Sequence, residues 1–95
     1  MTDELTPFRR RIDECDEKIV RMINERLKVC REVGELKSAQ GIAVRIPERE
    51  EEVIAKAIGL NDGPCPPEVL EKIFRILIDT AVALEESLDS ARPEQ

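Results

Sequence analysis

The chain has 95 residues, of which 38% are charged and 41% hydrophobic, and its formal net charge is −6. That length corresponds to one domain, and the acidic balance argues against a nucleic-acid partner or an anionic membrane surface. Histidine is absent and the three cysteines are widely spaced, which argues against zinc and haem sites.

We expect a single domain over residues 1–95, with an ordered core from 5 to 90 and a frayed tail from 91 to 95. No apolar run reaches the length of a transmembrane helix, and the first residues lack the features of a signal peptide. These observations favour a cytoplasmic protein. We expect the side chains of Cys15 and Cys30 to be buried among apolar residues.

The first predicted helix begins with Thr6 as N-cap and Pro7 at the first helical position, and ends near Gln40, where Gly41 is a typical terminator. Within it, apolar residues recur at intervals of three and four, which is the helical period. They are Phe8, Ile12, Cys15, Ile19, Met22, Ile23, Leu27, Cys30, Val33 and Leu36. The helix is roughly 34 residues, or about 50 Å, long.

A helix of this length is too long for a compact monomer. A compact domain of this size has a radius of gyration of about 12 Å and hence a diameter of about 30 Å. Half of the helix would therefore overhang with its apolar stripe exposed. We expect a homodimer in which the two long helices pair.

Two shorter helices follow. One opens at Pro47 and ends between Gly59 and Gly63, with Val53, Ile54, Ala57 and Ile58 inward. The other opens at Pro66–Pro67, and its apolar stripe is Leu70, Ile73, Phe74, Leu77, Ala81, Leu84 and Leu88. No stretch alternates with the period of a strand. The predicted fold class is all-α, with one long and two shorter helices forming an intertwined helical dimer.

Four charged residues lie on the apolar faces of these helices. Arg26 follows Met22 by four residues, and Lys37, eleven residues later, points within about 20° of the same direction. Glu50 and Glu85 lie on the apolar faces of the second and third helices. Lys and Arg side chains can reach solvent from the edge of an apolar face, and Arg and Glu can pair across a bundle, but burying such charges is costly unless they are satisfied. Four of them on three helices favour a pocket for a small polyanion.

Arg9 lies about 100° around the helix from Arg26, because seventeen residues separate them. It therefore does not share the same pocket easily. In a dimer with paired long helices, we expect Arg9 to serve the pocket of the partner subunit.

Several segments, taken in order, resemble the all-helical chorismate mutases. Residues 8–20, FRRRIDECDEKIV, are similar to the family's L-R-x-x-I-D-x-I-D-x-x-I/L, and residues 24–26 fit the helix-embedded arginine that follows. Residues 33–37, VGELK, resemble V-G-x-x-K, and residues 47–50, PERE, resemble the P-x-R-E that opens the second helix. The resemblance extends over residues 5–88.

The resemblance implies a function and a role for each matching residue. The family converts chorismate to prephenate by a Claisen rearrangement that needs no metal, cofactor or covalent intermediate, so catalysis is orientation plus electrostatic stabilisation. Arg26, with Arg9 of the partner subunit, would grip the two substrate carboxylates. Lys37 would donate a hydrogen bond to the ether oxygen, Glu50 would accept one from the ring hydroxyl, and Arg49 would hold nearby carboxylates in place.

Three further site positions depart from the family's common pattern. Glu85 stands where many bacterial members have a glutamine that donates to the ether oxygen, so Glu85 must be protonated to help, and we expect activity to fall as pH rises. Ala81 stands where some members have a serine that touches a substrate carboxylate. Ile46 stands where an aspartate N-cap is common, so the second helix lacks a side-chain cap. These departures favour weaker binding or a related substrate.

Other functions remain open at this point. A mutase acting on 4-amino-4-deoxychorismate fits as well, because Glu50 could hold an ammonium group. An isochorismate pyruvate lyase shares the arginines and the lysine but generally lacks a carboxylate at the Glu50 position. A non-catalytic helical dimerisation or regulatory module needs the hydrophobic seam but not the four inward charges. The chain could be free-standing or part of a longer polypeptide.

Overall fold

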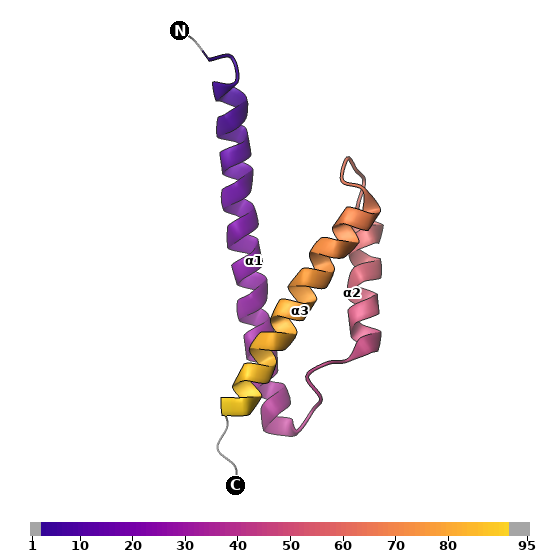
Figure 1. Ribbon diagram of the computed structural model, residues 1–95. Coiled ribbons are helices and arrows are strands. Elements are labelled where there is room, and N and C mark those ends of the chain that lie inside the picture. Colours follow the sequence, from indigo (N-terminus) through magenta and orange to yellow (C-terminus); the bar gives the residue numbers. More distant parts are fainter. Residues whose placement is uncertain (1–2, 92–95) are drawn as a thin grey trace.

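A computed structural model describes residues 3–91 as three helices (Figure 1): α1 (Thr6–Gln40), α2 (Pro47–Leu60) and α3 (Pro67–Ala91). The described residues contain no strand, so the predicted all-α fold of one long and two shorter helices is confirmed. Ala91 is still helical, although the frayed tail was expected to begin there. The rest of the predicted tail, residues 92–95, lies outside the described residues.

The helix ends follow from local chemistry, with one difference from the prediction. Leu5, not Thr6, is the N-cap of α1, and it makes no side-chain capping bond. Asp3 supplies the acceptors instead: its Oδ1 accepts from the backbone N–H of Leu5 at 2.9 Å, and its carbonyl accepts from that of Thr6 at 3.1 Å. At the other end, Gly41 adopts a left-handed φ of 67°, which confirms it as the terminator.

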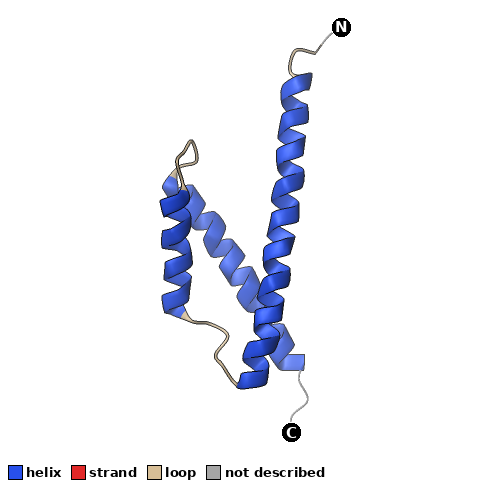
Figure 2. Cartoon of the chain, turned by 180° about the vertical axis from the view of Figure 1, so that it is seen from behind, coloured by secondary structure: helices blue, strands red, loops and turns tan. Residues whose placement is uncertain are grey.

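α3 packs against both other helices, whereas the Cα atoms of α1 and α2 stay more than 8 Å apart throughout the described part of the chain. Figure 1 and the reverse view in Figure 2 show α3 crossing the C-terminal half of α1 and running beside α2. A small core lies between α2, α3 and the segment that links α1 to α2. It consists of Ile54, Ile78 and Val82, with Val44, Val53 and Phe74 packed against it.

The buried face of α3 is rotated from the predicted one. Ile78 and Val82 are buried, although the predicted stripe omitted both, while Ile73 and Leu84 from that stripe are 45% and 37% exposed. Glu85, one turn after Ala81, shares the buried face. α3 contacts both α1 and α2, so its buried face is wider than one apolar stripe. The spacing of a single stripe therefore does not predict which residues are buried.

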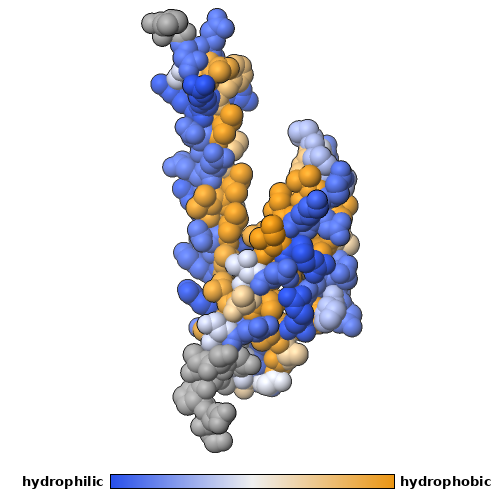
Figure 3. Space-filling model, viewed as in Figure 1, coloured by the Kyte–Doolittle hydropathy of each residue, from blue (hydrophilic) through white to orange (hydrophobic). Residues whose placement is uncertain are grey.

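The apolar stripe of α1 is largely exposed in the isolated chain. Phe8, Ile12 and Met22 are each more than half exposed, and the thiol-bearing Cys15 is exposed rather than buried as expected. Figure 3 shows this stripe facing an open notch between α1 and α3. The radius of gyration is 17.7 Å, far above the roughly 12 Å of a compact domain. No described helix is both long and apolar enough to cross a membrane.

Candidate active site

A pocket of about 420 Å³ lies where α1, α3 and the start of α2 converge. Seven of the eight predicted site residues line it. They are Arg26, Lys37, Ile46, Arg49, Glu50, Ala81 and Glu85. The remaining wall is mostly apolar and includes Ile78 and Val82 from the core. The pocket therefore places charged side chains directly above the packed interior, where water screens them least.

Lys37 and Glu85 face each other in this pocket. The Nζ of Lys37 lies 3.1 Å from Oε1 of Glu85, and their side chains are 16% and 6% exposed. Nζ also donates to the carbonyl of Val44 at 2.7 Å. The contact with Glu85 does not have hydrogen-bond geometry, so Oε1 has no hydrogen-bond donor among the described residues. An ammonium group carries three N–H donors, so Lys37 retains capacity for a ligand.

Gly34 explains how Glu85 reaches this position. It is the one buried residue of α1 within the described chain, and a Cβ built on it would lie 2.6 Å from Cγ of Glu85. The absence of a side chain lets α3 approach α1 and brings Glu85 toward Lys37, one turn further along α1. Gly34 belongs to the VGELK segment, but its packing role was not anticipated from the sequence.

Two arginines bind the second pocket carboxylate, Glu50. Oε1 of Glu50 accepts from Nη1 of Arg45 at 2.7 Å and from Nη1 of Arg75 at 3.0 Å. Oε2 is buried and has no hydrogen-bond donor among the described residues. An unpaired buried carboxylate oxygen is costly. In this pocket it is a ready acceptor for a ligand's hydroxyl or amino group.

The two arginines are themselves held from outside the pocket. Nη2 of Arg45 binds Asp79 at 3.0 Å, and Nη2 of Arg75 binds Glu51 at 3.2 Å. The hydrogen bond to Asp79, with the nearby charge of Glu50, raises the pKa of Arg45 above its ordinary value. Sequence reasoning missed both arginines, because their spacing resembles that of ordinary surface charges.

Arg26 is half-buried and makes no salt bridge with any described residue. Its guanidinium lies 6.0 Å from the centre of the Phe74 ring, and its Nη1 lies 3.7 Å from Sγ of Cys30. The aromatic contact is a cation–π arrangement. Neither contact neutralises the charge, so Arg26 is suited to bind an anionic group in the pocket.

The other two predicted arginines are placed differently. Arg49 lines the pocket, but its carboxylate partner is the exposed Glu52, at 3.3 Å, and not a pocket carboxylate. Arg9 does not line the pocket; it pairs with Asp3 at 2.7 Å and its side chain is 64% exposed. It lies seventeen residues before Arg26, about 25 Å away along α1.

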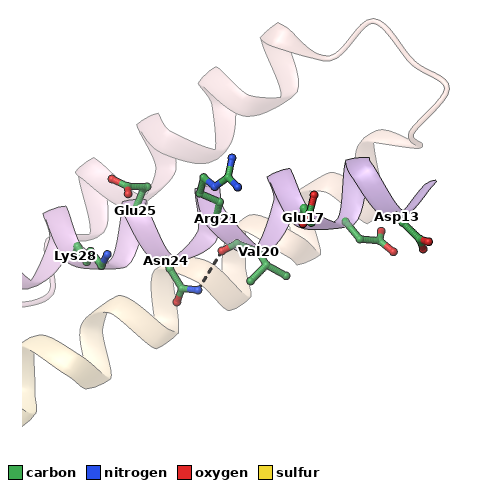
Figure 4. A pocket seen from close by; sticks show the side chains of 8 residues that line it. Asp13, Glu17, Val20, Arg21, Asn24, Glu25 and Lys28 are labelled. Atoms are coloured by element: carbon green, nitrogen blue, oxygen red, sulfur yellow. Dashed lines mark hydrogen bonds between the residues drawn. The ribbon is translucent and has the colours of Figure 1, made fainter. Parts of the chain in front are cut away.

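A second hollow of about 590 Å³ lies along α1 (Figure 4), and all the residues that line it belong to that one helix. Most of the residues that line it are charged, the first being Asp13 and the last Lys28. Among them, the side-chain amide of Asn24 donates to the carbonyl of Val20 at 3.1 Å. No second element encloses it. We therefore assign the chemistry to the pocket between the three helices. The described residues also contain no group of three or more potential metal ligands.

Comparison with known proteins supports this assignment. The chorismate mutase type II family model matches residues 8–86. A bifunctional chorismate mutase/prephenate dehydratase from Aquifex aeolicus is 38% identical over 93 residues, and the chain spans 26% of its length. A chorismate mutase from Methanocaldococcus jannaschii is 35% identical over 86 residues, which are 90% of this chain and 87% of that protein.

A solved structure shares the fold. The chorismate mutase (form II) from Thermus thermophilus superposes with a TM-score of 0.84 at 30% identity, covering 98% of this chain and 100% of that one. The similarity therefore includes the long α1 as well as the packed region around the pocket.

Proposed function

Because the chain belongs to the type II chorismate mutase family, we propose that it catalyses the rearrangement of chorismate to prephenate. The observation that carries this proposal is the pocket: Arg26, Lys37, Glu50 and Glu85 come together from three helices. The chain spans about a quarter of the bifunctional relatives. We propose that residues 5–90 form one domain with this activity.

Each polar group in the pocket suits one feature of this substrate. Arg26, with its uncompensated charge, binds a carboxylate. Lys37 donates a hydrogen bond to the ether oxygen, on which negative charge grows as the C–O bond breaks. Glu85, when protonated, donates a second one. The buried Oε2 of Glu50 accepts a hydrogen bond from the ring hydroxyl. No residue forms a covalent bond, so catalysis is orientation and electrostatic preorganisation.

We propose further that the active form is a homodimer in which Arg9 of the partner subunit completes the site. The exposed stripe of α1 and the notch beside it support this, because a second long helix would cover both. Arg9 lies on the uncovered half of α1, about 25 Å from Arg26 of the same chain. Light scattering should give twice the chain mass; a monomer at micromolar concentration would exclude the dimer.

We propose the cytoplasm as the location, because three free cysteines suit a reducing compartment. The first test of the activity is a direct assay. Purified protein is mixed with chorismate, the loss of ultraviolet absorbance is followed, and the product is identified by chromatography. Prephenate is the expected product. Turnover of 4-amino-4-deoxychorismate or isochorismate instead, or of none of the three, would contradict the proposal.

A further inference from the structure

We propose that Arg45 and Arg75 are positioning residues that hold Glu50 so that its Oε2 points to the substrate. This inference rests on the proposed function, in which Glu50 accepts from the ring hydroxyl. Neither arginine lines the pocket. Each would therefore act on the reaction only through the carboxylate it binds.

The geometry of the two contacts supports the proposal. Both arginines bind the same oxygen, Oε1, at 2.7 and 3.0 Å. Two charge-assisted hydrogen bonds occupy the lone pairs of that oxygen. Oε2 receives no such bond and is buried. The carboxylate is thus divided into one oxygen that anchors and one that remains available to a ligand.

The two arginines come from different parts of the fold, so together they fix more than either would alone. Arg45 lies in the segment between α1 and α2, and Arg75 lies on α3. Their outer nitrogens bind Asp79 and Glu51, which are more than half exposed. Glu50, with a side chain 10% exposed, is therefore the buried centre of a five-residue ion-pair network. A network restrains a flexible carboxylate better than one isolated pair.

The two guanidinium groups also offset the cost of burying the Glu50 carboxylate. A buried charge that loses one partner becomes destabilising or reorients toward its remaining partners. Removal of Arg75 would let the carboxylate turn toward Arg45 and solvent, because Arg45 is 46% exposed. Oε2 of Glu50 would then no longer point to the ring hydroxyl, although the substituted residue, Arg75, does not itself line the pocket.

A double-mutant cycle tests this coupling. Arg75→Met and Arg45→Met keep an unbranched side chain and remove the guanidinium; each is made in the wild-type chain and in Glu50→Ala. We expect kcat/KM for chorismate to fall about 10-fold in the wild-type background, comparable to one lost charge-assisted hydrogen bond. In the Glu50→Ala background the same changes should cost about twofold or less. Equal losses in both backgrounds would overturn the proposal, as would no loss in the wild type.

A matched control and a structural readout complete the test. Lys72→Met removes the same charge from an exposed position on α3 and should leave kcat/KM unchanged. Crystal structures of the wild-type chain and of Arg75→Met should show Glu50 reoriented only in the variant; an unmoved carboxylate would overturn the proposal even if the wild type had no activity. A wild type without turnover would overturn only the proposed function. If Arg75→Met does not fold, the Arg45→Met cycle decides alone.

Discussion

Gly34→Ala should reduce activity more than stability, because its main structural effect is on the spacing between α1 and α3. The added Cβ would lie 2.6 Å from Cγ, 3.1 Å from Cβ and 3.3 Å from Cα of Glu85. For an ordinary contact of 3.4 Å, the distance between the new Cβ and Cγ of Glu85 must increase by about 0.8 Å. A new rotamer of Glu85 cannot supply all of it, since its Cα is also too close. The helices must therefore move apart.

Two opposing effects set the change in stability. Overpacking costs about 1–3 kcal/mol, whereas replacing glycine by alanine inside a helix gains about 1 kcal/mol. The net loss is thus about 0–2 kcal/mol, and Tm should fall by no more than about 15 °C. The effect on activity should be larger, because Glu85 moves relative to Lys37. A misplacement of this size costs about 10- to 100-fold in kcat.

The measurements are a thermal melt and steady-state kinetics with chorismate. Gly59→Ala is the matched control, since it also lies within a helix and its new Cβ would meet nothing within 4 Å. It should raise Tm by about 4–8 °C and leave kcat unchanged. If Gly34→Ala behaved like Gly59→Ala in both measurements, the close approach of α3 would not position Glu85, and the reasoning would be refuted.

Three other predictions test the site. Lys37→Ala should reduce kcat by about 10²-fold, the loss typical of one oxyanion donor; near-normal turnover would exclude its role. Glu85→Gln should preserve or raise kcat, because a neutral side-chain amide can donate to the ether oxygen whereas a carboxylate can only accept; a loss as large as that of Lys37→Ala would contradict this. Mixed Arg9→Ala and Lys37→Ala chains, each nearly inactive alone, should recover about a quarter of wild-type activity if each site takes Arg9 from the partner subunit. No recovery in confirmed mixed dimers would place Arg9 elsewhere.

The sequence predicted the helices well because their ends are marked by proline and glycine. Pro47, Pro67 and Gly41 each lie where the structure begins or ends a helix. The sequence predicted the buried face of α3 less well. Ile78 and Val82 form the core, yet the spacing of apolar residues on α3 allows several stripes. The choice between them is made by contacts with α1 and α2, which a single helix does not encode.

The same distinction holds for the pocket. Arg26, Lys37, Glu50 and Glu85 could be predicted because each interrupts an apolar face, and the structure brings all four together. Arg45 and Arg75 do not interrupt an apolar face, because they lie at the edge of the packed region. Each reaches Glu50 on α2 from another part of the fold. Gly34 also gave no signal of its own, because the need for a missing side chain depends on the helix that packs against it.

The exposed half of α1 connects stability to the proposed chemistry. Phe8, Ile12 and Ile19 lie on that half and are each more than half exposed, which is unfavourable for an isolated chain. Arg9 lies on the same half and is too far from the pocket of its own chain. A second copy that buried the stripe would carry its own Arg9 toward this pocket. Burial of the apolar surface and completion of the anion site would then be one event, so the site would be complete only in the assembled state.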